Sequence, residues 1–304
     1  MPATPVAFAT PSGAARWQRW LIYSPPARLA IFVVLFVLAM LLVGGGLHLL
    51  GLGTHATALQ RSLAQFLMRA LPPLAAYLVL VKLIERRPLA ELAPRKLLPQ
   101  GLLGLVAGTL LFSAVVGMLW LLGSYRVTGI NPEVDWLPAL LMVGLGAGIG
   151  EEILFRGALF RIVEEGLGTW WALAVSALFF GLAHLANPGA TLWSSLAIAI
   201  EAGVLFGLLY HLSRSLPLCM GLHAAWNFCQ GTVYGIPVSG MKADGWLVST
   251  RSGPDWLSGG VFGAEASVVA LALCLLCSAV LLAVARHRHP FVPQRRRQRL
   301  QAMD

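Results

Sequence analysis

Long apolar runs, separated by short polar or proline-containing segments, make up most of the chain. A hydrocarbon core of about 30 Å is crossed by about 20 apolar helical residues, and most of the runs approach or exceed this length. The pattern therefore predicts an all-α fold, a polytopic transmembrane bundle of about eight helices. The expected helices cover residues 30–52, 63–84, 101–122, 137–163, 170–185, 192–212, 216–234 and 263–285.

Three of these runs have less distinct limits than the others. Runs 170–185 and 216–234 are short, and run 63–84 contains Arg69 and two consecutive prolines. The chain shows no internal repeat and no separate soluble domain. We therefore expect three parts: an N-terminal cytoplasmic segment, 1–28; a transmembrane domain, 29–285, with its motif core at 144–230; and a basic cytoplasmic tail, 286–304.

Composition supports a membrane protein. Of the 304 residues, 58% are hydrophobic and 12% are charged, against about 25% charged in ordinary soluble domains. A soluble protein of this composition would have too few polar side chains to cover its surface. All four cysteines lie in apolar runs, so the C-x-x-C spacing of Cys274 and Cys277 indicates packing rather than a redox or metal site.

The net charge of +9 comes mainly from basic residues that flank the apolar runs. They gather in the N-terminal segment, between Lys82 and Lys96, and after Arg286. Aromatic residues do not interleave with the internal loop or the C-terminal tail, so no nucleic-acid partner is expected. Basic flanks are typical of cytoplasmic loops that face the lipid bilayer. We therefore expect a multi-pass protein of the bacterial inner membrane with both termini in the cytoplasm.

The internal basic loop, residues 85–100, alternates charged residues with leucine. Two interpretations fit this pattern: a short amphipathic element at the membrane interface and a plain solvated connector. Both interpretations place the charges of the loop at the surface of the protein.

Alternating glycines occupy the fourth expected helix. Gly144 with Gly148, and Gly146 with Gly150, form two GxxxG pairs that allow helix backbones to approach closely in a bilayer. No strand precedes them, so they indicate helix packing and not a dinucleotide site.

Two adjacent acids come directly after these glycines within the same apolar run. Carboxylates inside a membrane helix are costly and need partners. Glu152 and Arg156 are four residues apart, so they can pair along one face of the helix. Glu151 points about 100° away from that face and has no local cation. A polar seam between helices would need only one such acid, so the pair favours a catalytic site.

Histidine and asparagine side chains lie on two later helices. His184 follows Phe180 by four residues and Asn227 follows His223 by four, so each pair shares one helix face. A lone buried histidine is usually a hydrogen-bonded structural residue. Two histidines and an asparagine facing intramembrane acids favour chemistry, because histidine can activate water or bind metal and asparagine can donate to an oxyanion.

These three short motifs, in this order on successive helices, resemble those of the CAAX prenyl endopeptidase and bacteriocin-processing family of intramembrane proteases, also called CPBP or Abi. The motifs are Glu151-Glu152-x-x-x-Arg156, Phe180-x-x-x-His184 and His223-x-x-x-Asn227. The resemblance covers residues 144–230. It implies an endopeptidase that hydrolyses a peptide bond of a membrane-associated protein or peptide.

The resemblance also implies a role for each residue. Glu151 would be the general base that activates water, assisted by His184. His223 and Asn227 would stabilise the oxyanion of the tetrahedral intermediate. The residues that orient the site would be Glu152 and Arg156.

The resemblance leaves the cofactor open, because members of the family have been described both as metalloproteases and as glutamate-dependent proteases. The sequence has no HExxH helix, so a metal-free reaction is favoured, with zinc bound by His184 and His223 as the alternative. A rival function is that of a transporter, chaperone or immunity-type scaffold built around the same polar cavity. The lack of repeat symmetry argues against a transporter.

Two further residues of the core have more than one interpretation. Glu201 is an acid without an evident partner, which could line a water path or reach His211 or a neighbouring helix. Trp226 could form a wall of a substrate groove, although packing is the simpler role for it.

Overall fold

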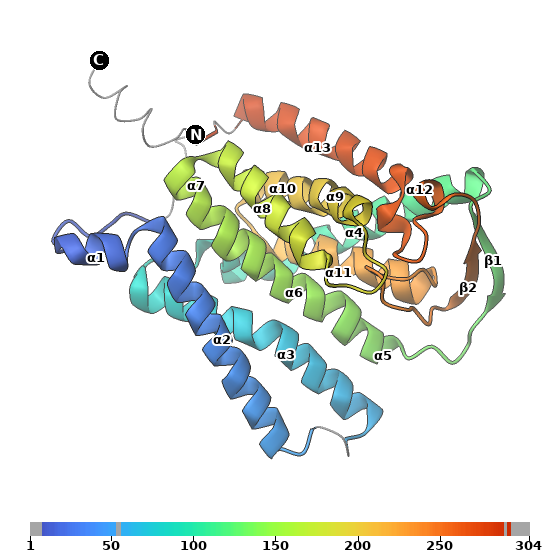
Figure 1. Ribbon diagram of the computed structural model, residues 1–304, viewed down its shortest axis with the longest axis horizontal. Coiled ribbons are helices and arrows are strands. Elements are labelled where there is room, and N and C mark those ends of the chain that lie inside the picture. The colour runs from blue at the N-terminus through green and yellow to red at the C-terminus, as the bar shows by residue number, and fades with distance from the viewer. Residues whose placement is uncertain (1–7, 53–55, 289–290, 293–304) are drawn as a thin grey trace.

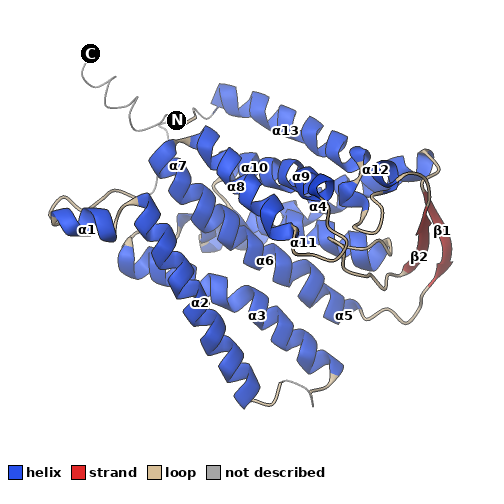
Figure 2. Ribbon diagram, viewed as in Figure 1, coloured by secondary structure: helices blue, strands red, loops and turns tan. Residues whose placement is uncertain are grey.

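Helices lie side by side in a bundle that carries a small two-stranded sheet at one end (Figure 1). The computed structural model describes residues 8–52, 56–288 and 291–292. Within these residues, Figure 2 shows helix through the bundle and strand only at its edge. The all-α prediction is confirmed. Most of the predicted basic tail, 286–304, lies outside the described residues.

The first part of the chain forms two antiparallel helices and one long helix that crosses the bundle. Its elements are α1 (Arg16–Leu21), α2 (Pro25–Leu49), α3 (Ala58–Val79), η1 (Leu80–Ile84), η2 (Ala90–Leu92), α4 (Pro94–Leu121) and β1 (Tyr125–Ile130). A continuous helical rod comes next, made of α5 (Trp136–Ala139), η3 (Leu140–Gly146), α6 (Ala147–Glu152), η4 (Ile153–Phe160) and α7 (Arg161–Leu167).

The second part of the chain packs around this rod. Its elements are α8 (Thr169–His184), α9 (Leu192–Ile198), η5 (Ala199–Val204), α10 (Leu205–Ser213), α11 (Leu216–Phe228), η6 (Cys229–Val233), β2 (Leu247–Arg251), α12 (Asp255–Ser258), η7 (Ala264–Ala266) and α13 (Val268–Arg288).

Six helices of the described chain are long and apolar enough to cross a membrane, which makes the protein a multi-pass integral membrane protein. They are Pro25–Leu49, Ala58–Ile84, Pro94–Leu121, Trp136–Leu167, Leu192–Ser213 and Val268–His287. The sequence pattern predicted about eight spans. The difference lies in two helices: α8 has 16 residues, and α11 is largely buried and carries polar side chains. Neither reaches the length and composition of a span.

Glycine lets α11 pack tightly in the middle of the bundle. Gly104 and Gly108 of α4 face the α11 backbone, and a Cβ added at Gly108 would collide with the carbonyl oxygen of Leu222. This close approach holds α11 at a fixed height and rotation against α4.

The two GxxxG pairs of the rod face two different helices. A Cβ at Gly148 would lie 2.8 Å from the carbonyl oxygen of Met220 in α11. A Cβ at Gly150 would collide with the backbone of Arg69 in α3. The predicted packing role of the glycines is confirmed, and together they hold the segment just before Glu151 between α3 and α11.

The antiparallel pair of β1 and β2 joins two segments that are far apart in the sequence. It brings the segment after α4 next to the segment before α12, at the end of the bundle opposite α1 (Figure 1). The sequence did not predict these strands, because each is short and lies in a segment between apolar runs.

Three charged side chains of loop 85–100 turn inward, Glu85, Arg87 and Glu91, whereas Arg86 and Arg95 stay exposed. Glu85 Oε1 accepts from Arg28 Nη1 of α2 at 2.8 Å and from Arg161 Nη2 at 3.0 Å. Arg87 joins Glu85 to Glu91 through ion pairs of 2.8 and 2.9 Å. The loop is therefore not a plain solvated connector, because half of its charges are paired inside the protein.

Glu165 of α7 completes the cluster by pairing with Arg28 and Arg161. We call the six residues the basal ion network: Arg28, Glu85, Arg87, Glu91, Arg161 and Glu165. Three arginines balance three glutamates, as buried charges require. Burial acts to raise the pKa of Glu85, but the arginines around it, Arg161 foremost, hold it below its ordinary value. The network fastens the α2–α3 pair to α7.

Candidate active site

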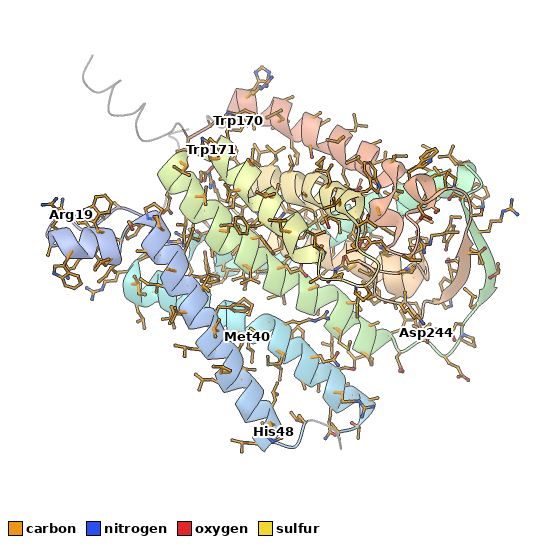
Figure 3. The ribbon with its side chains drawn as sticks, in the orientation of Figure 1. Arg19, Met40, His48, Trp170, Trp171 and Asp244 are labelled. Atoms are coloured by element: carbon orange, nitrogen blue, oxygen red, sulfur yellow. The ribbon has the colours of Figure 1, made fainter. Side chains whose placement is uncertain are left out.

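A cavity of about 700 Å³ opens between the α2–α3 pair, the rod and α11. Phe36 and Met40 of α2 and Met68 of α3 give it an apolar wall. Figure 3 labels Met40 and also Asp244, in the loop before β2, which lines the cavity as well. Four of the predicted site residues line it too: Glu151, His184, His223 and Asn227. The fold thus brings together side chains from three helices.

Glu152 is fully buried and holds two partners with one oxygen atom. Its Oε1 accepts from Arg156 Nη1 at 3.1 Å and from His223 Nδ1 at 2.8 Å. The predicted pairing of Glu152 with Arg156 is confirmed. A carboxylate paired with arginine accepts but does not donate, so His223 carries a proton on Nδ1. The other nitrogen of the ring, Nε2, is the one nearest Glu151.

Arg156 anchors this chain of contacts to η5 and to two aromatic rings. Its Nη2 donates to the carbonyl oxygens of Ala202 at 2.7 Å and Gly203 at 3.4 Å. Its guanidinium carbon lies 4.8 Å from the ring centroid of Phe180 and 5.2 Å from that of Phe206. Carbonyl oxygens and aromatic faces both attract a cation. These contacts fix the guanidinium and, through it, the acid with which it pairs.

π-Helical turns set the rotation of these side chains. η4 begins at Ile153, directly after Glu152, and η5 supplies the carbonyl oxygens that Arg156 reaches. A π turn inserts extra backbone into a helix and rotates the residues beyond it, and such turns are frequent at functional sites. Hydrophobic periodicity in the sequence did not predict them.

Glu151 is the acid that faces the cavity. Its side chain is 31% exposed, whereas that of Glu152 is fully buried. Its Oε2 atom lies 3.9 Å from His223 Nε2 and has no hydrogen-bond partner in the described structure. This distance is too long for a direct hydrogen bond, but one water molecule can contact both atoms. No ion-pair contact joins Glu151 to His184 among the described residues, so assistance by His184 stays a prediction.

His184 and Asn227 present the remaining polar atoms. His184 Nδ1 donates to the carbonyl oxygen of Phe180 at 2.8 Å. A carbonyl oxygen only accepts, so the neutral ring keeps a lone pair on Nε2. Asn227 Nδ2 donates to the carbonyl oxygen of Val143 at 3.3 Å, which leaves the second N–H of the amide for another acceptor.

The segment that carries these side chains also matches a known family. Residues 133–229 match the family model described as Type II CAAX prenyl endopeptidase Rce1-like. The predicted resemblance is confirmed. The match contains all six predicted site residues, begins shortly before α5 and ends at the first residue of η6. Searches of curated proteins and of solved structures found no match.

The Rce1-like match indicates a hydrolase, because proteins of this family are proteases. It does not extend over α2 and α3, although Phe36, Met40 and Met68 from these helices line the cavity beside Glu151. The wall opposite the acids is therefore built by the part of the chain that the family model leaves out.

Several polar residues of the site were not predicted. Arg69 lines the large cavity, and its Nη1 donates to the carbonyl oxygen of Met142 at 2.9 Å. Ser239 and Glu265 come from the segment between η6 and α13 and line a small second cavity together with His184 and His223. This segment has no periodic pattern, so its return to the middle of the bundle could not be read from the sequence.

Glu201 and Trp226, which the sequence left with more than one interpretation, have distinct surroundings in the structure. Glu201 does not reach His211, because His211 Nδ1 pairs with Glu164 Oε1 at 2.9 Å. Trp226 is buried, and its ring meets that of Phe112 edge-on with centroids 5.0 Å apart. Trp226 therefore packs in the core, and both Trp226 and Glu201 line a second, small cavity.

The donor set does not fit a resident zinc ion. Among the described residues, no group of three histidine, cysteine or acidic side chains lies close enough to hold a metal ion. Protein zinc sites take three or four such ligands. The two histidines donate through Nδ1 to Phe180 and Glu152, which leaves the Nε2 atom of each ring toward the cavity.

Proposed function

We propose that this protein is an intramembrane endopeptidase that hydrolyses a peptide bond of a membrane-associated protein or peptide. One observation carries the proposal: the partly exposed Glu151 lies beside Nε2 of His223. The other ring nitrogen of His223, Nδ1, is hydrogen-bonded to the buried Glu152, which is paired with Arg156. An ionisable carboxylate in a cavity, next to an oriented imidazole, is suited to general base catalysis. The Rce1-like match supports the same class of reaction.

In the first step Glu151 takes a proton from a water molecule in the cavity. His184 accepts the second hydrogen of this water at Nε2 and so orients it. The water oxygen forms a bond to the carbonyl carbon of the substrate, and the carbonyl oxygen becomes an oxyanion. No metal is needed for this step.

The oxyanion is stabilised by donors from α11. Asn227 offers the free N–H of its amide. His223 offers Nε2–H when its ring, flanked by the carboxylates of Glu151 and Glu152, holds a second proton. When the intermediate collapses, the C–N bond breaks and the leaving nitrogen gains a proton. One water is consumed, and one carboxylic acid and one amine are formed.

The apolar wall of the cavity suggests how a substrate enters. Phe36, Met40 and Met68 offer a surface for a hydrocarbon chain, and Arg69 offers a cation for a terminal carboxylate. We propose a substrate that ends in a prenylated cysteine and three further residues, the motif that the family description names. For orientation we propose what the basic flanks predict, with both termini in the cytoplasm.

A farnesylated peptide ending in Cys-a-a-X tests this proposal. Purified full-length protein in lipid nanodiscs is expected to release the last three residues, with the cut located by mass spectrometry. Reaction in ¹⁸O-labelled water is expected to place one ¹⁸O atom in the new carboxylate. A second arm compares the protein termini of cells that produce the wild type or Glu151→Gln. Identical termini in both cells, with no cleavage of the peptide, would rule out the protease.

Removal of metal ions is expected to leave this cleavage intact. Since no step uses a metal, dialysis against a strong chelator should change the turnover little, and the purified protein should contain no stoichiometric zinc. Zinc content and activity would be measured on the same samples. Activity that falls with the zinc content and returns when zinc is added would give His184 and His223 the role of ligands.

Substitution of Asn227 by alanine is expected to lower turnover by about 10²–10³-fold while substrate binding changes little. The reason is that its amide donates to charge that exists only in the transition state. Asn227→Asp should be at least as slow, because a carboxylate repels an oxyanion. Asn187→Ala, a change at another asparagine of the same cavity, is the matched control and should retain activity. Equal losses in both alanine variants would remove the oxyanion role.

A further inference from the structure

A second cavity, of about 40 Å³, lies behind the candidate active site. His184, His223, Asn227 and Ser239 line both this inner cavity and the large one. Its volume holds roughly two or three water molecules. The two histidines therefore contact both the substrate side and this small inner cavity.

Two acids that take no part in the proposed steps line this inner cavity: Glu201 of η5 and Glu265 of η7. They are only 3% and 4% exposed. The Oε1 atom of each has no hydrogen-bond partner in the described part of the chain. Glu265 also has hydrogen-bond partners in Ser239 and Gln230. A buried carboxylate oxygen without a partner is costly, so the two unpartnered Oε1 atoms call for an explanation.

Desolvation and mutual repulsion disfavour two ionised carboxylates in one small buried cavity, so such acids retain a proton. Burial raises the pKa of Glu265 above its ordinary value, and the Ser239 hydroxyl and His184 offset only part of this effect. The other titratable or charged groups that face the pair are His223, Cys274 of α13 and Arg251 of β2. The guanidinium of Arg251 also donates to Ser258.

We propose that Glu201 and Glu265 form a proton-holding pair that supplies the proton gained by the leaving nitrogen. This inference rests on the proposed peptide hydrolysis. As the C–N bond breaks, its electron pair stays on nitrogen, and a proton moves to that nitrogen from the pair through inner-cavity water and a histidine ring. The proton that Glu151 took from the attacking water returns to the pair by the same route. Each turnover thus leaves the pair with the proton it had at the start.

The position of the pair fits this role. Glu201 directly precedes Ala202, whose carbonyl oxygen accepts from the guanidinium of Arg156. The element that holds one acid is therefore tied to the residue that orients the active site. The two histidines at the boundary can pass protons, because imidazole exchanges a proton at either nitrogen.

Infrared spectroscopy tests the pair without any substrate. The folded wild type in nanodiscs at neutral pH is expected to show the carbonyl stretch of a protonated carboxylic acid. The double variant Glu201→Gln/Glu265→Gln should lose this band, and Glu133→Gln, at an exposed acid before α5, should keep it. Glutamine has the size of glutamate and removes a buried acid, and thermal unfolding would verify that the variants fold. A wild type without the band overturns the inference.

Kinetics with the farnesylated peptide test the proton transfer from the Glu201–Glu265 pair to the leaving nitrogen, which we call the relay. Each single glutamine variant is expected to lower kcat about tenfold with KM nearly unchanged, and to enlarge the solvent deuterium isotope effect, because proton delivery becomes slow. Glu201→Asp should recover part of the rate. In the wild type kcat should fall at high pH as the pair loses its proton, and this fall should vanish in the double variant.

These experiments distinguish an error in the proposed peptide hydrolysis from an error in the proton transfer alone. If neither the wild type nor Glu151→Gln cuts the peptide and the protein termini in cells are unchanged, peptide hydrolysis is wrong, and the relay with it. If the wild type cuts, Glu151→Gln does not, and both pair variants keep the kcat and pH profile of the wild type, only the relay is wrong. A band that persists in the double variant likewise overturns the pair alone.

Discussion

Replacement of Glu151 by glutamine is expected to abolish peptide hydrolysis and leave folding intact. Glutamine has nearly the same shape, but its amide cannot take a proton from water. Loss of a general base lowers turnover by about 10²–10⁴-fold, and we expect the upper end because Glu151 is the acid of the substrate cavity that lies beside His223. The side chain is 31% exposed, and its neighbour His223 keeps its hydrogen bond to Glu152, so no buried charge is left without a partner.

The loss of hydrolysis is measured by the rate of cleavage of the farnesylated peptide. The intact folding is measured by thermal unfolding of the same preparation. Asp244→Asn is the matched control, because Asp244 is another acid of the same cavity and accepts a hydrogen bond from the exposed Asn131. It should keep both activity and stability. A Glu151→Gln protein that retains most of its turnover would show that Glu151 is not the base.

Replacement of Arg156 by alanine is expected to damage stability as well as activity. Arg156 and Glu152 are both fully buried, and removal of the guanidinium leaves the Glu152 carboxylate with His223 as its remaining partner. Breaking a buried pair of this kind costs about 3–5 kcal/mol. The free energy of unfolding would be measured by denaturant titration in mixed micelles. Turnover should fall because Glu152 no longer holds His223 in place.

A double variant separates charge from packing in this loss. Glu152→Gln combined with Arg156→Ala removes both charges and should be more stable than Arg156→Ala alone. Arg69→Ala is the control, since Arg69 is a less buried arginine of the same cavity and should cost little stability. If Glu151→Gln and Arg156→Ala lose stability to the same degree, the distinction between a catalytic and an orienting residue is wrong.

The sequence predicted the features that depend on residues close to one another in the chain. Four-residue spacing was enough to pair Glu152 with Arg156 and to put His223 and Asn227 on the same cavity. The GxxxG pairs predicted close helix contacts, which the packing around Gly148 confirms. Apolar runs located the helices, since length and hydropathy suffice for spans that face lipid.

Features that depend on contacts between distant segments could not be predicted in this way. Loop 85–100 looked like a surface element because its charge pattern says nothing of Arg28 or Arg161, which turn its acids inward. Glu265 lies in a segment without periodicity, and only the fold brings it into the cavity that Glu201 lines. The π turns depend on how the helices pack and have no signature in residue spacing.

The basal ion network also imposes an order on the biosynthesis of this protein. Arg28 and Glu85 are 57 residues apart, and Glu85 and Arg161 are 76 residues apart. Chains are made from the N-terminus, so α2 and α3 enter the bilayer before the charges of α7 exist. Until the ribosome has passed Glu165, the ion pairs that fasten this helical pair to α7 cannot form. The wall of the cavity that faces Glu151 is therefore made first and gains its ion pairs to α7 only later.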